Sequence, residues 1–316
     1  MGLKETFQKQ GGMRLIKQYF RAGVLGTAMG EFLLLGKSRT ALEILRLSTQ
    51  LKTKQKIGKK YNQVLERFDK AYDPSLPHQS SDKIWICWLQ GMENAPEIVK
   101  KCYQSIKDNL PDRDIIVVTS DNMDKYVQFP DYILDKWKSG AITNTHITDL
   151  LRLELLIRYG GMWLDATVFC SEQRENIPDY FFDSNLFFFQ SLKPGRDGKA
   201  LYISSWLMSA KTNNKVLMAT KELCYAYWKR ERVIKDYFLL HSFFSIVLDR
   251  YKDEWDKVVP RDNAAPHILL LRLFEKYDEK TWNVIKEQTP FHKLSYKFDM
   301  DKKSLANTYY QNVLMK

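Results

Sequence analysis

Residues 149–169 read DLLRLELLIRYGGMWLDATVF, and this stretch decides the fold class. Its apolar residues recur at helical spacing, which predicts an amphipathic helix over 144–159 that stops at the glycine pair 160–161. The short apolar run at 162–165 predicts a strand that ends on the carboxylate of Asp165. A buried strand directly after an amphipathic helix is typical of a sheet covered by helices.

The rest of the chain continues this alternation. Apolar runs predict buried strands at 83–88, 114–119, 186–190 and 202–210. Helical spacing predicts helices at 95–109, 214–229 and 234–251. Strands that alternate with helices indicate an α/β fold with a mainly parallel sheet, in which ligands bind at the carboxyl ends of the strands.

Composition divides the chain into a basic helical arm at 1–68, a polar linker at 69–81 and a main domain at 82–316. Residues 1–60 contain thirteen Lys and Arg but three Asp and Glu, so they hold ten of the eleven net positive charges. Helical spacing within the arm predicts helices at 4–20 and 38–68. The basic character therefore belongs to the arm and not to the main domain.

The basic arm suggests an anionic membrane surface as a partner, because its apolar residues have the spacing of an interfacial helix. A helical cap packed on the main domain, with solvated charges, explains the same pattern. Nucleic acid is not an expected partner, since the sequence has no zinc-finger spacing and no RNA-binding aromatic motif. The apolar stretch at 24–35 is too short to span a bilayer, no signal peptide is evident, and the four cysteines form no CxxC pair. The expected location is therefore peripheral, at the cytoplasmic face of the plasma membrane.

Three charged residues of the opening stretch make a candidate site. Asp149 and Arg152 lie three apart on one helix face, where the alternative interpretation is a surface ion pair worth about 0–1 kcal/mol. Asp165 is harder to dismiss, because a carboxylate at the end of a buried strand needs a paired charge or a bound cation. The acids can bind hydroxyls or a hard cation, and the arginine can meet the negative charge of a sugar diphosphate.

The pattern D-x-x-R-x-x-x-L-x-x-Y-G-G-x-W-x-D resembles the donor-site signature of glycosyltransferase family 32 and of the related glucosylating toxins. Within that group it is most similar to bacterial capsular polysaccharide synthesis proteins. Further agreement comes from IWICWLQGMENAPEIVKKC at 84–102, SSW at 204–206, YFLLHSFF at 237–244 and HKLSYK at 292–297. The resemblance covers the region from about 80 to 300 and implies a GT-A fold, a nucleotide-sugar donor and transfer with retention of configuration.

The resemblance also implies roles for single residues. Asp149 and Arg152 would hold the hydroxyls of the donor sugar and the ribose, and Asp165 would be the first acid of a D-x-D motif, near ribose and metal. Trp88, at the end of the first strand, matches a tryptophan that stacks on uracil in the toxin relatives. Trp85 is the competing choice, and core packing is the alternative for either ring.

The resemblance implies a divalent metal, Mn²⁺ or Mg²⁺, but Thr167 stands where the second acid of D-x-D is expected. The Thr167 hydroxyl would be a weak ligand, or Asp165 would hold the metal with help from His292. The alternative for His292 is an ordinary core or surface histidine. His241, and after it His267, are weaker candidates with the same alternative.

The expected function is a retaining α-hexosyltransferase that moves galactose or glucose from a UDP-sugar to a lipid-linked glycan in surface polysaccharide synthesis. Trp206 of SSW is assigned to the nucleotide-sugar site, and the basic loop at 193–199 either folds over the diphosphate or acceptor or is a solvated hairpin. Alternatives are a mannosyltransferase that uses GDP-mannose and, because of Thr167, a non-catalytic nucleotide-sugar-binding protein on a degenerate GT-A scaffold. No carboxylate pair can be assigned as nucleophile and acid, so transfer on the front face of the sugar is expected.

Overall fold

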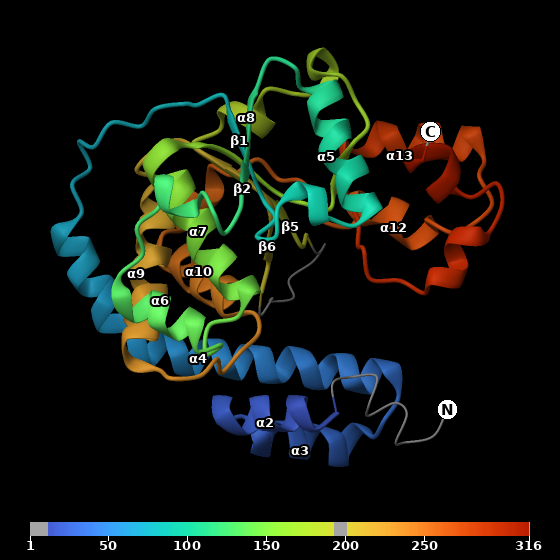
Figure 1. Ribbon diagram of the computed structural model, residues 1–316. Coiled ribbons are helices and arrows are strands. Elements are labelled where there is room, and N and C mark those ends of the chain that lie inside the picture. Colours follow the sequence, from blue (N-terminus) through green and yellow to red (C-terminus); the bar gives the residue numbers. More distant parts are fainter. Residues whose placement is uncertain (1–11, 193–200, 316) are drawn as a thin grey trace.

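The computed structural model describes residues 12–192 and 201–315, and its centre is a five-stranded sheet with the order β2-β1-β3-β6-β5 (Figure 1). The strands are β1 (Lys83–Cys87), β2 (Asp114–Val118), β3 (Gly161–Asp165), β5 (Leu186–Gln190) and β6 (Ile203–Ala210). β1 is parallel to both β2 and β3, whereas β6 is antiparallel to both β3 and β5, so four strands share one direction. The expected α/β fold with a mainly parallel sheet is confirmed.

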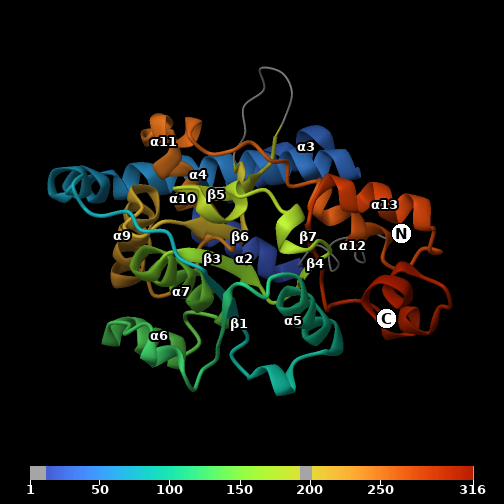
Figure 2. The same ribbon diagram turned by 90° about the horizontal axis from the view of Figure 1, so that it is seen from above.

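Helices cover both faces of this sheet (Figure 2). One face packs on α4 (Arg39–Ala71), α6 (Asp131–Lys138), α7 (Asn144–Tyr159), α9 (Lys215–Arg230) and α10 (Leu239–Arg250). The other packs on α5 (Glu97–Asn109) and α8 (Tyr180–Asp183). Because successive side chains of a strand point to opposite faces, Trp85 and Trp163 join the first core, and Ile84 and Met162 join the second.

The turn between α7 and β3 depends on two glycines. Gly160 and Gly161 have φ values of 65° and 90°, a region that glycine adopts far more readily than other residues. A Cβ at Gly161 would overlap the carbonyl oxygen of Lys83, so β3 approaches β1 too closely for any side chain there. The register then pairs Cys87 with Asp165, which places the carboxylate at the carboxyl edge of the sheet.

The chain after β3 forms a second, two-stranded sheet. β4 (Val168–Cys170) pairs antiparallel with β7 (Phe291–Lys293), so the C-terminal segment returns next to the end of β3. The helices beside this sheet are α12 (Ile268–Arg272) and α13 (Glu279–Gln288), whereas α11 (Lys252–Asp256) contacts α10. A third apolar cluster packs α12, α13 and the C-terminal turns against α5. This pairing brings residues far apart in sequence to the edge where Asp165 lies.

The N-terminal arm consists of α2 (Gly12–Ala22), α3 (Leu25–Leu35) and most of α4, after which residues 72–82 link to β1. The second half of α4 is part of the main core, where Tyr61 and Leu65 are buried beside α9 and α10. α2 and α3 lie beneath α4, on its side away from the sheet (Figure 1). Within the described ranges, no helix is both long and apolar enough to cross a bilayer. The loop expected at 193–199 and the first residues of the helix expected from residue 4 lie outside the described residues.

Candidate active site

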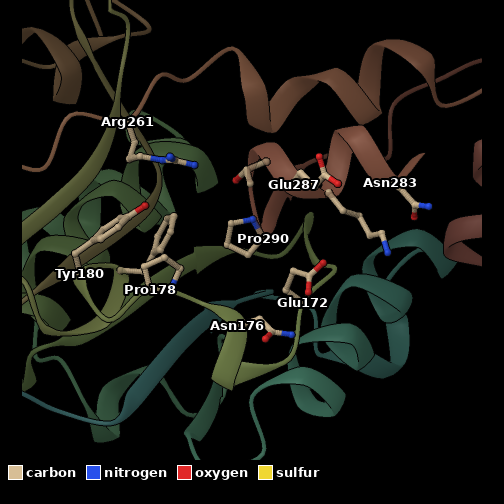
Figure 3. Close-up of a pocket in the computed structure, with 11 residues that line it drawn as sticks. Glu172, Asn176, Pro178, Tyr180, Arg261, Asn283, Glu287 and Pro290 are labelled. Carbon is tan, nitrogen blue, oxygen red and sulfur yellow. The ribbon is translucent and has the colours of Figure 1, made fainter. Parts of the chain in front are cut away.

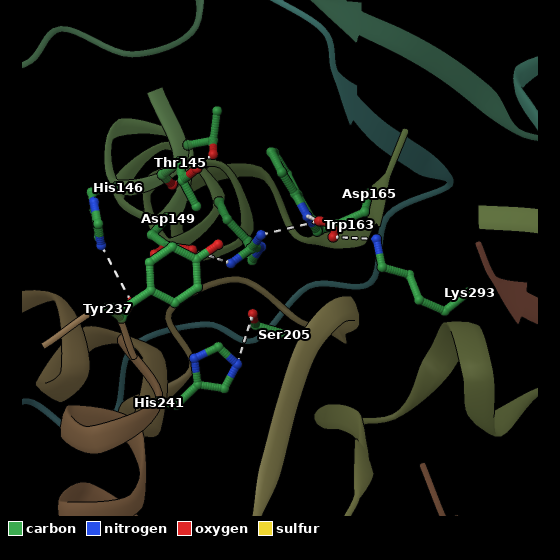
Figure 4. Close-up of polar contacts among 11 residues, drawn as sticks. Thr145, His146, Asp149, Trp163, Asp165, Ser205, Tyr237, His241 and Lys293 are labelled. Atoms are coloured by element: carbon green, nitrogen blue, oxygen red, sulfur yellow. Dashed lines mark hydrogen bonds and ion pairs between the residues drawn. The ribbon is translucent and has the colours of Figure 1, made fainter. Parts of the chain in front are cut away.

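Arg152 joins the two acids that the sequence singles out, Asp149 and Asp165, which are labelled in Figure 4. Its Nη1 donates to Asp149 Oδ1 at 2.8 Å, and its Nη2 donates to Asp165 Oδ1 at 3.2 Å. The guanidinium lies 4.7 Å from the centre of the Trp163 ring, whose Nε1 also donates to Asp165 Oδ1 at 3.1 Å. The Arg152 side chain is only 5% exposed, so the surface ion pair that the spacing also allowed is not what forms.

Lys293 completes this charged cluster from the other side. Its Nζ lies 2.9 Å from Asp165 Oδ2 and 2.7 Å from Thr167 Oγ1. Burial alone would raise the pKa of Asp165, but the charges of Lys293 and Arg152 outweigh burial and hold that pKa below its ordinary value. Asp165 is therefore ionised at neutral pH, with one cation at each of its oxygens.

A cavity of about 370 Å³ opens over this cluster. Asp149, Arg152, Asp165, Thr167 and Lys293 line it, as do residues 144, 145 and 148 of the first turns of α7. The amino end of a helix carries a partial positive charge, which favours an anion in this cavity. The prediction that the Asp–Arg couple and the strand-end acid face one cavity is therefore confirmed as geometry, while the role of each residue stays a prediction.

The three tryptophans assigned to the donor site lie in different places. Trp88 lines the cavity, edge-on to Tyr296 with the ring centres 5.5 Å apart. Trp85 is fully buried, and its Nε1 donates to the Gly160 carbonyl at 3.0 Å, as a core residue would. Trp206 is buried, stacks on Phe189 and is absent from the cavity lining. Of the three assigned tryptophans, Trp88 is therefore the one that lines the cavity with Asp165.

The histidines are less well placed than the lysine. His292 precedes Lys293 on β7, so its side chain points to the opposite face, where its ring is fully buried and its Nε2 lies 2.9 Å from Ser171 Oγ. Burial lowers the pKa of His292 to about 3 and that of His241 to about 4, so both are neutral at pH 7. His241 Nε2 lies 3.3 Å from Ser205 Oγ, a contact that is dashed in Figure 4.

The side chains around Asp165 do not fit a divalent cation. Both Asp165 oxygens already contact a cationic nitrogen, and the Thr167 hydroxyl faces the Lys293 ammonium. A hard cation prefers several free oxygen ligands, which this arrangement does not supply. In the described part of the chain, no three His, Cys, Asp or Glu side chains gather where they would hold a metal ion.

Among the cavity residues that sequence reasoning missed are Lys293 and Tyr296. Both belong to HKLSYK, the segment from which His292 was selected. The alternation of side chains along a strand was the signal that separates His292 from its neighbour, because two successive residues cannot face the same site.

A second cavity, of about 520 Å³, lies beside the β4–β7 sheet and α13 (Figure 3). Its lining includes Tyr180, Arg261, Glu172 and Glu287, and none of the residues around Asp165. Arg261 Nη2 donates to the Gln288 carbonyl at 2.6 Å, so its charge is partly used within the protein. Both cavities contain two acids, an arginine and a lysine, but in the smaller one Arg152 and Lys293 form ion pairs with the acids at the carboxyl edge of the sheet, so we take it as the candidate active site.

The family model described as capsular polysaccharide synthesis protein matches residues 38–313. This match covers most of the chain, including α4, the whole sheet and β7. The chain therefore belongs to the family of capsular polysaccharide synthesis proteins.

Two relatives are named as O-glycosyltransferases. O-glycosyltransferase PaGT of Phomopsis amygdali is 27% identical over 146 residues, which are 43% of this chain and 36% of that protein. O-glycosyltransferase braB of Annulohypoxylon truncatum is 30% identical over 129 residues, 35% of this chain and 31% of that protein. The matches thus span about a third of each relative. A solved structure described as PaToxG Glycosyltransferase overlaps 82% of this chain and 94% of its own at 15% identity, with a TM-score of 0.41.

Proposed function

We propose that this chain is a retaining α-glycosyltransferase that moves a hexose, galactose or glucose, from a UDP-sugar to a lipid-linked glycan in surface polysaccharide synthesis. The observation that carries the proposal is the convergence of Asp149, Arg152, Asp165 and Trp88 on one cavity at the carboxyl edge of the sheet. Membership of the capsular polysaccharide synthesis family supports it, as do relatives named O-glycosyltransferases.

Each side chain has a task that suits its position. The Trp88 ring offers a face or edge to the nucleobase, and stacking on an aromatic ring suits any base. Asp149 and Asp165 accept hydrogen bonds from sugar and ribose hydroxyls, since carboxylates are acceptors when ionised. Arg152 holds both acids in place through its two terminal nitrogens, so it positions the acids and adds positive charge near the diphosphate.

The reaction breaks the bond between C1 of the sugar and the β-phosphate oxygen. The electron pair of that bond goes to the phosphate, and the acceptor hydroxyl oxygen bonds to C1 on the same face. The departing phosphate takes the hydroxyl proton, so UDP leaves and configuration is retained. The negative charge that grows on the phosphate is stabilised by fixed dipoles and cations, here the amino end of α7 and the basic side chains of the cavity.

A donor screen tests this function. UDP-galactose, UDP-glucose and GDP-mannose are each incubated with the protein, with and without Mn²⁺, and release of the nucleoside diphosphate is measured. We expect release from one UDP-sugar and a loss of at least about 100-fold in Asp165→Asn. Asp253→Asn, an exposed acid of α11, is the matched control and should keep full activity. Release from GDP-mannose alone would make the chain a mannosyltransferase, and donor binding without release would indicate a non-catalytic binding protein.

We also propose that α2 and α3 lie on the cytoplasmic face of the plasma membrane, on anionic lipid. The side chains of Leu33 and Leu34 are 80% and 82% exposed, and Lys37 and Arg39 follow them at the surface. The acid of α3, Glu31, accepts a hydrogen bond from Ser48 of α4 at 3.1 Å. An apolar ridge beside exposed basic residues is the pattern of an interfacial helix, and a lipid-linked acceptor would be reached from there.

Co-sedimentation with vesicles tests the membrane proposal. We expect binding to phosphatidylglycerol–phosphatidylcholine vesicles that weakens in salt, and little binding to phosphatidylcholine alone. Burying the Leu33 and Leu34 side chains in the bilayer should stabilise membrane binding by about 3–6 kcal/mol. The double variant Leu33→Glu, Leu34→Glu should therefore no longer bind. Leu271→Glu changes a leucine of α12 that is 78% exposed and should bind as the unaltered protein does. Equal binding by all three proteins would refute the assignment of this surface.

A further inference from the structure

Lys293 reaches the site because of two features of the second sheet. β7 pairs with β4 directly after Asp165, and the Leu294 amide donates to the Thr167 carbonyl at 2.9 Å, which fixes the backbone of Lys293 beside the D-x-T segment. The side chain is 20% exposed and lines the cavity. A lysine thus lies where a ligand in the cavity would meet it, 128 residues along the chain from Asp165.

The charges of the cavity suggest what this lysine does. The charged residues of its lining are two acids, Asp149 and Asp165, and two bases, Arg152 and Lys293. A divalent cation together with two carboxylates has no net charge. An ammonium group together with one carboxylate has no net charge either. Thr167 stands where the resemblance implies an acid, and the positive charge of Lys293 balances the negative charge of Asp165 without a cation.

The two bases differ in what they can still bind. The guanidinium of Arg152 is 5% exposed and held by two carboxylates over the Trp163 ring. An ammonium group has three donors, and Lys293 directs two of them to Asp165 and Thr167. The third is left for a phosphate oxygen, and the flexible stem of a lysine lets it follow the phosphate as the bond to the sugar breaks.

We propose that the Lys293 ammonium group takes the place of a divalent cation beside the donor diphosphate, so that this glycosyltransferase works without metal. The inference rests on the function proposed above. Lys293 pairs with the diphosphate in the bound donor and stabilises the charge that grows on the departing phosphate. Asp165 and Thr167 keep the ammonium at the carboxyl edge of the sheet.

The test compares the unaltered protein with Lys293→Met and with Lys280→Met, which removes an exposed lysine of α13. Diphosphate release from the UDP-sugar and calorimetric binding of UDP and of uridine are measured in EDTA and in Mn²⁺. We expect the unaltered protein and Lys280→Met to release UDP equally well in both. Lys293→Met should lose about 100-fold in release and bind UDP more weakly, but bind uridine unchanged, because uridine has no phosphate.

A second variant separates this role from simple stability. Lys293→Ala combined with Thr167→Asp restores two acids at the site, so its UDP binding should be weak in EDTA and recover in Mn²⁺. Release by the unaltered protein that stops in EDTA and returns with Mn²⁺ would overturn the inference and leave the glycosyltransferase proposal standing. Equal UDP affinity in Lys293→Met would do the same. Absence of donor binding under every condition would overturn both.

Discussion

Replacing Arg152 with methionine should destabilise the protein by about 3 kcal/mol at pH 7. Methionine keeps an unbranched stem, although a shorter one, and removes the guanidinium that contacts Asp149 and Asp165. Both carboxylates then stay partly buried, and Asp165 keeps Lys293 as its cation. The site would therefore lose its central charge together with the contact between the guanidinium and the Trp163 ring.

The magnitude follows from the burial of the pair. Removing one partner of a buried ion pair costs about 3–5 kcal/mol, whereas exposed pairs contribute about 0–1 kcal/mol. Arg152 belongs to the first class, because its side chain is 5% exposed. The partial exposure of the two acids and the remaining Lys293 contact place the expected loss at the lower end of that range.

Urea denaturation followed by circular dichroism measures this loss. Arg250→Met is the matched control: Arg250 Nε donates to Asp69 at 2.8 Å, but its side chain is 33% exposed, so we expect a loss below about 1 kcal/mol. Adding Asp149→Asn to Arg152→Met should recover about 1–2 kcal/mol, because an uncompensated charge is removed. Equal losses in Arg152→Met and Arg250→Met would refute the view that the site is a buried charge cluster.

The pH dependence gives a second check on the same variant. The pKa of Asp165 lies below its ordinary value, so its contribution to stability is present above about pH 4 and is lost as the pH falls further. Arg152→Met removes one of the two cations that lower the pKa of Asp165. The pKa of Asp165 should therefore be higher in the variant than in the unaltered protein. The difference in unfolding free energy between the two proteins should therefore be largest at pH 7 and shrink toward pH 3.

Two further predictions concern the fold around the site. Gly161→Ala should lower the free energy of unfolding by more than about 3 kcal/mol in urea denaturation, because φ is 90° there and the new Cβ would overlap the Lys83 carbonyl oxygen. Gly140→Ala, where φ is 75° and the space is open, should lower it by about 1 kcal/mol. Burial lowers the pKa of His292 to about 3 in the folded protein, whereas it is about 6.5 in the unfolded chain. Below pH 6.5 only the unfolded chain gains a proton at this residue, so the free energy of unfolding falls by up to about 1.4 kcal/mol per pH unit. His292→Phe should show a shallower loss between pH 6.5 and 4.5, and an unchanged slope would show that this histidine is not the group that titrates.

The elements nearest the candidate site could be predicted from the sequence because their signals are local. The helix expected at 144–159 is α7, since its apolar spacing and the glycine pair at 160–161 define both its length and its end. The strand that follows it ends on Asp165 as expected. Parallel pairing then places Asp165 beside Cys87 at the carboxyl edge, where the class of fold already locates its ligands.

The position of Lys293 could not be predicted in the same way, because it depends on pairing between distant segments. β7 is three residues long, which is too short for a periodic pattern, and it pairs with β4, a strand far away in the sequence. Sequence reasoning selected His292 because the resemblance to GT-A enzymes implies a late histidine on the metal. That choice also fixes which face of β7 would point at Asp165. A shift of one residue along a strand exchanges its two faces.

The face of β7 that points inward matters because it determines which side chain, His292 or Lys293, lies beside Asp165. With the histidine inward, the site would gain a neutral imidazole and Asp165 would have an open oxygen for a cation. With Lys293 inward, Asp165 Oδ2 is occupied and the charge beside the diphosphate is supplied by the protein itself. The same alternation buries the His292 ring against Trp282, with 5.5 Å between ring centres, where a charged side chain would be costly. The lysine has to face the cavity because the other face of β7 is part of the core, and so the packing of β7 determines the charge of the site.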